Sequence, residues 1–292
     1  MKKYLKLFLD ELPKQTYFQN LEIVLDHNEP DEEEIMWVRE FQKKYPNKIK
    51  HIIIKNVDPI GISMNRCIKE STGEFLTIWN VDDLRTSNSI ELQAQILTEN
   101  INFDIVYGDY EVVDSFGKKN GKIVVHEKFP PEELTRSMII GPFFMFRKEI
   151  CNKAGYFDEQ LKSGADFDFA IRLALHGVAK SINKNLGYYL NEGLGASTRP
   201  NSKQPLERTV IELRYGIYDK IDYSFLPDAL NYEIYNTIQF GKKIPVNDLA
   251  PNYQEYISKQ KDNLFLLGMK NFLKKKKAKK YSIKKFIKKI IR

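Results

Sequence analysis

Short apolar segments alternate with amphipathic helical segments between residues 21 and 107, and this alternation limits the fold more than any other feature. The apolar runs lie at 21–25, 51–54, 75–79 and 103–107, each bounded by polar residues, as buried strands are. Helical spacing of apolar residues separates these runs at 31–45, 63–71 and 89–97. This order predicts an α/β fold with a mostly parallel sheet flanked by helices.

The remainder of the chain is less regular. An extended segment at 107–113 precedes a turn at 114–117, and a further strand is expected at 142–147. Helices are predicted at 132–137 and 166–176, and the pattern beyond residue 205 is helical. Leu5, Leu9 and Leu12 follow helical spacing, so the N-terminal segment is interpreted as an amphipathic helix rather than a signal peptide.

An acidic pair directly follows the third predicted strand. Asn80, Val81, Asp82 and Asp83 lie where the carboxyl end of a parallel strand would place them, the edge at which such sheets bind ligands. Mg²⁺ and Mn²⁺ prefer oxygen ligands and are often held by one or two carboxylates together with substrate phosphates. The alternative is a solvated turn in which one aspartate caps the next helix.

Several ordered motifs together resemble a known family. They are Gly61–Ile68, Gly73–Phe75, Asn80–Asp83, Gly155–Glu159 and Ala165–Ala174. In order and separation they resemble the family 2 glycosyltransferases, whose GT-A fold is a Rossmann-like, mostly parallel sheet flanked by helices. The resemblance extends over residues 15–200, about two thirds of the chain.

The resemblance implies a role for each matching position. Asp166 matches the base that deprotonates the acceptor hydroxyl, and Asp82, with Asp83 beside it, matches the site for Mn²⁺ or Mg²⁺. Family members generally invert the anomeric carbon in one displacement. The nucleotide-sugar donor would contact four residues: Asp26, Asn65, Asn80 and Asp82.

The sequence departs from the family pattern at four places. Asn80 stands in place of the first acidic residue of the metal motif, and Ala165 replaces the glutamate that usually precedes the base. Glu192 lies where a metal-binding histidine often occurs, and is either an oxygen ligand or a solvated loop carboxylate. In the family, a first strand precedes the helix that matches Tyr4–Lys14, and this sequence begins at that helix. Either the fold does without this strand or the start codon is placed late.

The charge is distributed unevenly. Residues 270–292 contain twelve Lys or Arg residues and no acid, while the rest of the chain has a formal charge of about −5. Isoleucines and Phe286 follow helical spacing in 283–291, with lysines on the other face, as in a helix that binds an anionic membrane surface. A solvated chain end is the alternative; a nucleic-acid partner is not expected, because the tail has few aromatic residues.

These observations lead to one main hypothesis. Residues 1–205 form a GT-A-like glycosyltransferase domain, 206–269 a helical C-terminal region and 270–292 a basic amphipathic tail. The enzyme would transfer a sugar to a glycan or lipid-linked acceptor in polysaccharide biosynthesis. Two distant cysteines fit a reducing cytoplasmic location, peripheral to the membrane. The alternatives are a non-catalytic carbohydrate-binding or scaffold subunit and a nucleotidyltransferase, although a glycine-rich phosphate loop is missing.

Overall fold

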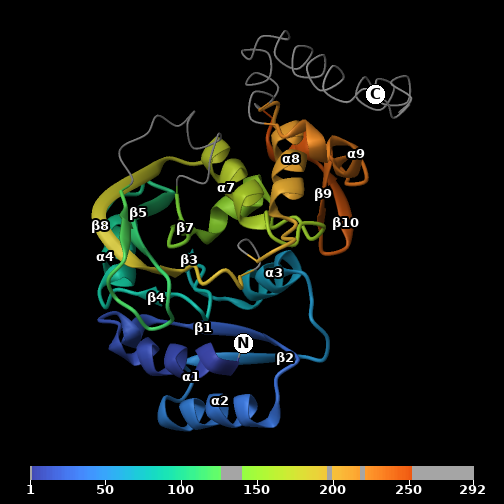
Figure 1. Ribbon diagram of the computed structural model, residues 1–292. Helices are drawn as coiled ribbons and strands as arrows, with labels where there is room; N and C mark the ends of the chain where they lie inside the picture. The colour runs from blue at the N-terminus through green and yellow to red at the C-terminus, as the bar shows by residue number, and fades with distance from the viewer. Residues whose placement is uncertain (1, 126–139, 196–198, 218–220, 252–292) are drawn as a thin grey trace, which may run out of the picture.

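The computed structural model describes residues 2–125, 140–195, 199–217 and 221–251 (Figure 1). The helix predicted at 132–137 and the basic tail at 270–292 lie outside these residues. Among the described helices, none has both the length and the apolar character needed to cross a bilayer.

The N-terminal part is a two-stranded parallel sheet covered by two helices. Strands β1 (Ile23–Asn28) and β2 (Ile49–Ile54) pair in register from Ile23 with Ile49. Helices α1 (Lys2–Glu11) and α2 (Glu32–Lys44) bury their apolar faces against this pair (Figure 1). The shared apolar cluster consists of nine buried side chains: Leu5, Phe8, Leu9, Leu12, Phe18, Leu25, Val38, Phe41 and Ile49.

Helix α2 begins where its sequence predicts. The Asp31 side chain accepts a hydrogen bond from the backbone N–H of Glu34 at 2.9 Å, and the Glu34 side chain accepts one from the N–H of Asp31 at 3.0 Å. This reciprocal capping box satisfies two backbone donors that helix geometry leaves unpaired. The predicted amphipathic helix at the N-terminus is confirmed by α1.

The larger sheet has the strand order β3–β7–β5–β8–β4, with β6 paired to β5. Its strands are β3 (Phe75–Thr77), β4 (Leu84–Arg85), β5 (Ile105–Val113), β6 (Lys122–Val124), β7 (Met145–Arg147) and β8 (Ala179–Leu190). The α/β class is confirmed, but the pairing differs from the mostly parallel sheet that was predicted. Among the described strands of this sheet, only β5 and β8 pair in parallel. Strand β7 lies antiparallel between β3 and β5, and the β4–β8 and β5–β6 pairs are antiparallel as well.

Helices cover both faces of the larger sheet. Ile105 and Tyr107 of β5 pack in the cluster of helix α7 (Ala165–His176), while Val106 between them packs against helix α4 (Ser89–Glu99). The alternation follows from the pleat, which sends successive side chains to opposite faces. Figure 1 shows helix α3 (Ile60–Glu70) between the β1–β2 pair and α7, and Ile68 joins the α7 cluster.

The C-terminal part packs beside α7. It contains α8 (Gln204–Arg214), α9 (Leu226–Ala229) and α10 (Val246–Leu249). The helical pattern predicted beyond residue 205 did not include the antiparallel hairpin of β9 (Asn236–Gln239) and β10 (Lys242–Pro245) that lies between α9 and α10. Helix α6 (Cys151–Ala154) precedes α7. Short 3₁₀ helices lie at Leu12–Lys14, Phe18–Asn20, Lys148–Ile150 and Tyr223–Phe225.

Candidate active site

The acidic pair lies in a turn that begins at the end of β3. The backbone N–H of Asp83 donates to the carbonyl of Asn80 at 3.0 Å, and the Asn80 side-chain amide donates to Asp83 Oδ2 at 3.3 Å. Asp83 Oδ1 accepts a hydrogen bond from the N–H of Leu190 at 2.9 Å, which ties the turn to the end of β8. The turn is thus held by the side chain of Asp83, and Asp82 lies at its surface side, half-buried.

The two adjacent carboxyl groups differ in environment. Burial, and next the charge of Asp82, raises the pKa of Asp83 to about 7. Burial also raises the pKa of Asp82, and Glu192 acts in the same direction while Lys3 opposes it. Lys3 forms an ion pair with Glu192 at 2.7 Å. A bound cation would favour the ionised form of both aspartates and so oppose the effect of burial.

Asp26 lies at the carboxyl-terminal half of β1, as its proposed donor-binding role requires, but its carboxylate is already engaged. Arg66 of α3 forms an ion pair with Asp26 and also donates to Asp58 at 2.5 Å. The Asn28 amide donates to Asp26 Oδ1 at 2.7 Å. A nucleotide would therefore have to contact the remaining lone pairs of Asp26 or replace Arg66.

Asn65 joins α3 to the Gly155–Glu159 segment, another of the motifs that resemble the family. Its amide donates to the carbonyl of Phe157 at 2.9 Å and its oxygen accepts from the N–H of Phe157 at 2.8 Å. A further bond from the amide reaches Glu159 at 2.9 Å. Asn65 is buried, and its hydrogen-bonding capacity is used within the protein, so its contact with a donor remains a prediction.

Asp166 is the second residue of α7 and is exposed to solvent. Its carboxylate accepts a hydrogen bond from the N–H of Phe167 at 2.8 Å, and the positive end of the helix dipole favours its charge. Desolvation by the surrounding protein nevertheless raises the pKa of Asp166, and the charge of Glu207 adds to this effect. Among the described residues, no side chain donates to this carboxylate, which leaves it accessible to a proton donor from substrate.

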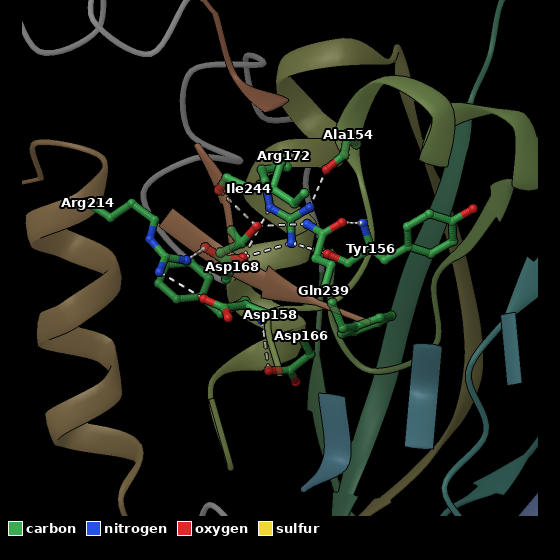
Figure 2. A network of polar contacts seen from close by, with 12 residues as sticks. Ala154, Tyr156, Asp158, Asp166, Asp168, Arg172, Arg214, Gln239 and Ile244 are labelled. Carbon is green, nitrogen blue, oxygen red and sulfur yellow. Dashed lines mark hydrogen bonds and ion pairs between the residues drawn. The ribbon is translucent and has the colours of Figure 1, made fainter. Parts of the chain in front are cut away.

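Asp168, two residues further along α7, lies in a different environment. It is fully buried and accepts hydrogen bonds from Arg172, from Arg214 at 2.6 Å and from the Tyr215 hydroxyl at 2.9 Å. Although burial acts in the opposite direction, Arg214 and Arg172 lower the pKa of Asp168. Figure 2 shows this network, with Asp166 apart from the two guanidinium groups.

The described residues contain no group of three or more His, Cys, Asp or Glu side chains arranged to hold a metal ion. A divalent ion bound together with a diphosphate needs only one or two protein carboxylates. Asp82 fits such a site because it is half-buried and carries no ion pair of its own among the described contacts. Asp83 has lone pairs left beyond its bonds to Leu190 and Asn80, and its part in metal binding remains a prediction.

Sequence reasoning missed two residues of α8 that contact the start of α7. Glu207 accepts hydrogen bonds from three consecutive backbone N–H groups at 162–164, and Arg214 bridges Asp158 and Asp168. A signal was present: Glu207 and Arg214 are seven residues apart and share one helix face with the apolar Val210 and Ile211. Charged residues on a buried helix face need partners, and here the partners are in α7 and the segment before it.

Comparison with known proteins decides the family. Residues 2–155 match the model described as "Glycosyl transferase family 2", which is more than half of the chain. The chain belongs to glycosyl transferase family 2. An uncharacterized glycosyltransferase of Rickettsia typhi is 30% identical over 174 residues, 56% of this chain and 52% of that protein. The chain spans between a quarter and about half of the length of the Rickettsia relatives it matches.

Solved structures give the fold of this family 2 protein. S. aureus TarS 1-349, solved in complex with UDP-GlcNAc, has a TM-score of 0.58 at 16% identity, with 93% of this chain and 77% of that one covered. The mannosyltransferase PcManGT of Pyrobaculum calidifontis, solved with GDP-Man and Mn²⁺, has a TM-score of 0.51 at 12% identity, with 99% and 76% covered. The fold is of the GT-A type, as the sequence predicted.

Proposed function

We propose that the chain is a glycosyltransferase that moves a sugar from a nucleoside-diphosphate donor to a glycan or lipid-linked acceptor. The observation that carries the proposal is the family match together with the places of two acidic groups. Asp82 lies in the turn after β3, half-buried, and Asp166 lies at the start of α7 with an accessible carboxylate. The similar structures bound to UDP-GlcNAc and GDP-Man support a nucleotide-sugar donor.

In the proposed reaction, Asp166 accepts the proton of an acceptor hydroxyl while that oxygen attacks the anomeric carbon. The raised pKa of Asp166 suits this role, because a more basic carboxylate accepts a proton more readily. One direct displacement inverts the anomeric configuration. A divalent cation held by Asp82, with Asp83 beside it, would supply positive charge to the diphosphate leaving group.

The binding of the donor is also assigned by residue. We propose that Asp26 and Asn80 contact the nucleotide and that Asn65 supports the donor site from α3. Asn80 retains an oxygen acceptor for a ribose hydroxyl, although its amide donates to Asp83. The proposed membrane partner of residues 270–292 and the peripheral location rest on the charge and spacing of that segment, and the cytoplasmic location rests on the two distant cysteines.

A non-catalytic role is the second candidate, because one observation favours it. The Asp26 carboxylate is already bound by Arg66 and Asn28, which leaves less capacity for a nucleotide. A carbohydrate-binding or scaffold subunit would not need this site. The two candidates make different predictions for nucleotide binding and for sugar transfer.

The test is calorimetric titration of the full chain with UDP, GDP and dTDP, with and without Mn²⁺, followed by donor hydrolysis and transfer assays. We expect metal-dependent binding of one nucleotide, abolished by Asp82→Ala. Asp166→Asn should retain donor binding and lose transfer. A folded protein that binds none of the nucleotides would favour the non-catalytic role, and full transfer by Asp166→Asn would exclude Asp166 as the base.

A further inference from the structure

We propose that Glu207 and Arg214 of α8 are positioning residues that fix the first turn of α7 and thereby hold Asp166 in place. The inference rests on the proposed role of Asp166 as the base. It assigns part of the active site to a helix that lies about fifty residues beyond the segment that matches the family.

Glu207 determines the path of the backbone into α7. Its carboxylate accepts hydrogen bonds from the N–H of Lys162 at 2.9 Å, of Ser163 at 2.7 Å and of Gly164 at 2.9 Å, and from the Ser163 hydroxyl at 3.2 Å. Glu207 is fully buried, so these four donors replace water around its charge. Gly164 is the residue before α7 and lies two positions from Asp166.

The close approach of α8 to this backbone is built into the sequence. A Cβ atom at Gly164 would lie 3.1 Å from Ile211 Cδ1 and 3.3 Å from Glu207 Cβ. A glycine is therefore suited to the position, because the side chains of α8 fill the space that a larger residue would need. The glycine thus lets α8 pack directly against the backbone at the start of α7.

Arg214 anchors α7 at Asp168, two residues after Asp166. Its guanidinium donates to Asp168 at 2.6 Å and to Asp158 at 2.8 Å, and its Nε donates to the carbonyl of Ile234 at 2.8 Å. Arg214, Asp158 and Asp168 are all fully buried. In the chain, Asp166 thus lies between two anchored residues, Gly164 and Asp168, while its own side chain stays exposed. Figure 2 shows Asp166 apart from the guanidinium group that binds Asp168.

In this arrangement one carboxylate, Asp166, is free to accept a proton, and other buried groups anchor the helix. A base must keep its carboxylate free for the proton that it accepts, so the carboxylate cannot also anchor the helix. The anchoring is done by buried charged groups on either side, which are satisfied and rigid. Such support matters because a displacement of about 1 Å at a reacting group can lower the rate by about 100-fold.

The test compares three single variants of the full chain: Glu207→Gln, Glu207→Asp and Glu212→Gln. Glu207→Gln removes the charge and presents an amide to backbone donors; Glu207→Asp keeps the charge and shortens the reach. Glu212→Gln is the matched control, because Glu212 is also buried on α8 but pairs with Arg208 at 2.8 Å. Each variant is first tested for folding by circular dichroism and thermal denaturation, and kinetics are compared for folded protein.

We expect Glu207→Gln to lower kcat about tenfold or more with the donor KM unchanged, and Glu212→Gln to keep the parental kcat. The acidic limb of the kcat–pH profile should move to lower pH in Glu207→Gln, because the charge that raises the pKa of Asp166 is gone. Glu207→Asp should lower kcat but leave the limb in place. If Glu207→Gln does not fold, Glu207→Asp replaces it as the test: a lowered kcat supports the inference, and parental kcat overturns it.

Parental kcat and an unmoved limb in folded Glu207→Gln would overturn the inference while leaving the proposed function intact. An equal effect of Glu212→Gln would also overturn it. If the parent protein transfers no sugar, the proposed function fails instead. NMR titration of the Asp166 carboxyl, identified by its loss in Asp166→Asn, then tests the charge effect of Glu207 on Asp166 without turnover: an identical titration in parent and Glu207→Gln would refute it.

Discussion

Replacing Arg214 by methionine should destabilise the protein strongly, because it leaves two buried carboxylates without their shared partner. Methionine fills a similar volume and adds no new polar group. Asp168 would retain Arg172 and Tyr215, and Asp158 would retain the N–H of Ile238 and the side-chain amide of Gln160, each at 2.8 Å. Neither set replaces the charge that Arg214 brings to both.

The magnitude follows from the burial of the whole network. Arg214 and both carboxylates have fully buried side chains, and removal of one partner of a buried ion pair costs about 3–5 kcal/mol. In a protein of this size each kcal/mol lowers Tm by roughly 2–4 °C. We therefore expect the midpoint of thermal unfolding to fall by roughly 6–20 °C.

Urea and thermal denaturation at pH 7 measure this loss, and Arg208→Met is the matched control. Arg208 lies on the same helix and pairs with Glu212 at 2.8 Å, but its side chain is 50% exposed. Water can reach the Arg208 end of this pair, although Glu212 is buried, so Arg208→Met should cost clearly less than loss of the fully buried Arg214. The comparison removes effects of net charge and helix propensity, which are the same in both variants.

The acid dependence provides a second reading of the same network. The folded-state pKa of Asp168 is lowered, so its ionisation stabilises the protein above its unfolded pKa, and that stability is lost as the pH falls. Arg214→Met should reduce this loss as the pH falls below the unfolded pKa of about 3.9. Equal stabilities of Arg214→Met and Arg208→Met, with parental acid dependence in both, would refute the reasoning.

Three further predictions concern other parts of the molecule. Because the folded-state pKa of Asp83 is raised to about 7, its ionisation destabilises the fold as pH rises from 4 to 7. In Asp83→Asn, the urea concentration at the unfolding midpoint should therefore fall less over that pH range. Burial lowers the pKa of His51 to about 4, so stability should fall as pH drops from 6.5 to 4, and less steeply in His51→Gln. Gly155 has a φ of 69° and a Cβ there would lie 2.8 Å from Gln239, so Gly155→Ala should cost about 1–3 kcal/mol in thermal denaturation, more than Gly241→Ala, whose Cβ meets open space.

Much of the fold is predictable where local signals are strong. The strand at β1, the capped helix α2 and the helix α7 agree with the sequence patterns because apolar periodicity and caps act within a few residues. Strand β8 was not predicted, since its sequence mixes lysines and asparagines with apolar residues, and its register against β5 shifts twice near Asp109. The antiparallel place of β7 depends on contacts between distant segments, which no local pattern contains.

In the candidate site, too, some features could be predicted from the sequence and others could not. Asp82, Asp83 and Asp166 could be proposed from the sequence because they lie in ordered motifs, and the structure puts Asp82 and Asp83 in one turn. What the sequence could not provide is the partner of each group. That Asp26 is bound by Arg66, or that Asp83 ties its turn to Leu190, follows only from the packing of separate segments.

The C-terminal segment, residues 204–251, contacts the candidate active site although it lies far along the chain from the acidic turn at 80–83. Asp158 belongs to a motif of the family region, yet it accepts hydrogen bonds from Ile238 of β9 and from Arg214 of α8. Glu159, the next residue, accepts from the N–H groups of Phe240 and Gly241 at the β9–β10 turn. These bonds join the hairpin to the same loop that Asn65 of α3 binds, so the hairpin supports the segment that leads into α7. Variation in 204–251 would therefore act on catalysis through the placement of α7, and a protein truncated before α8 should lose the order of that helix before it loses the sheet.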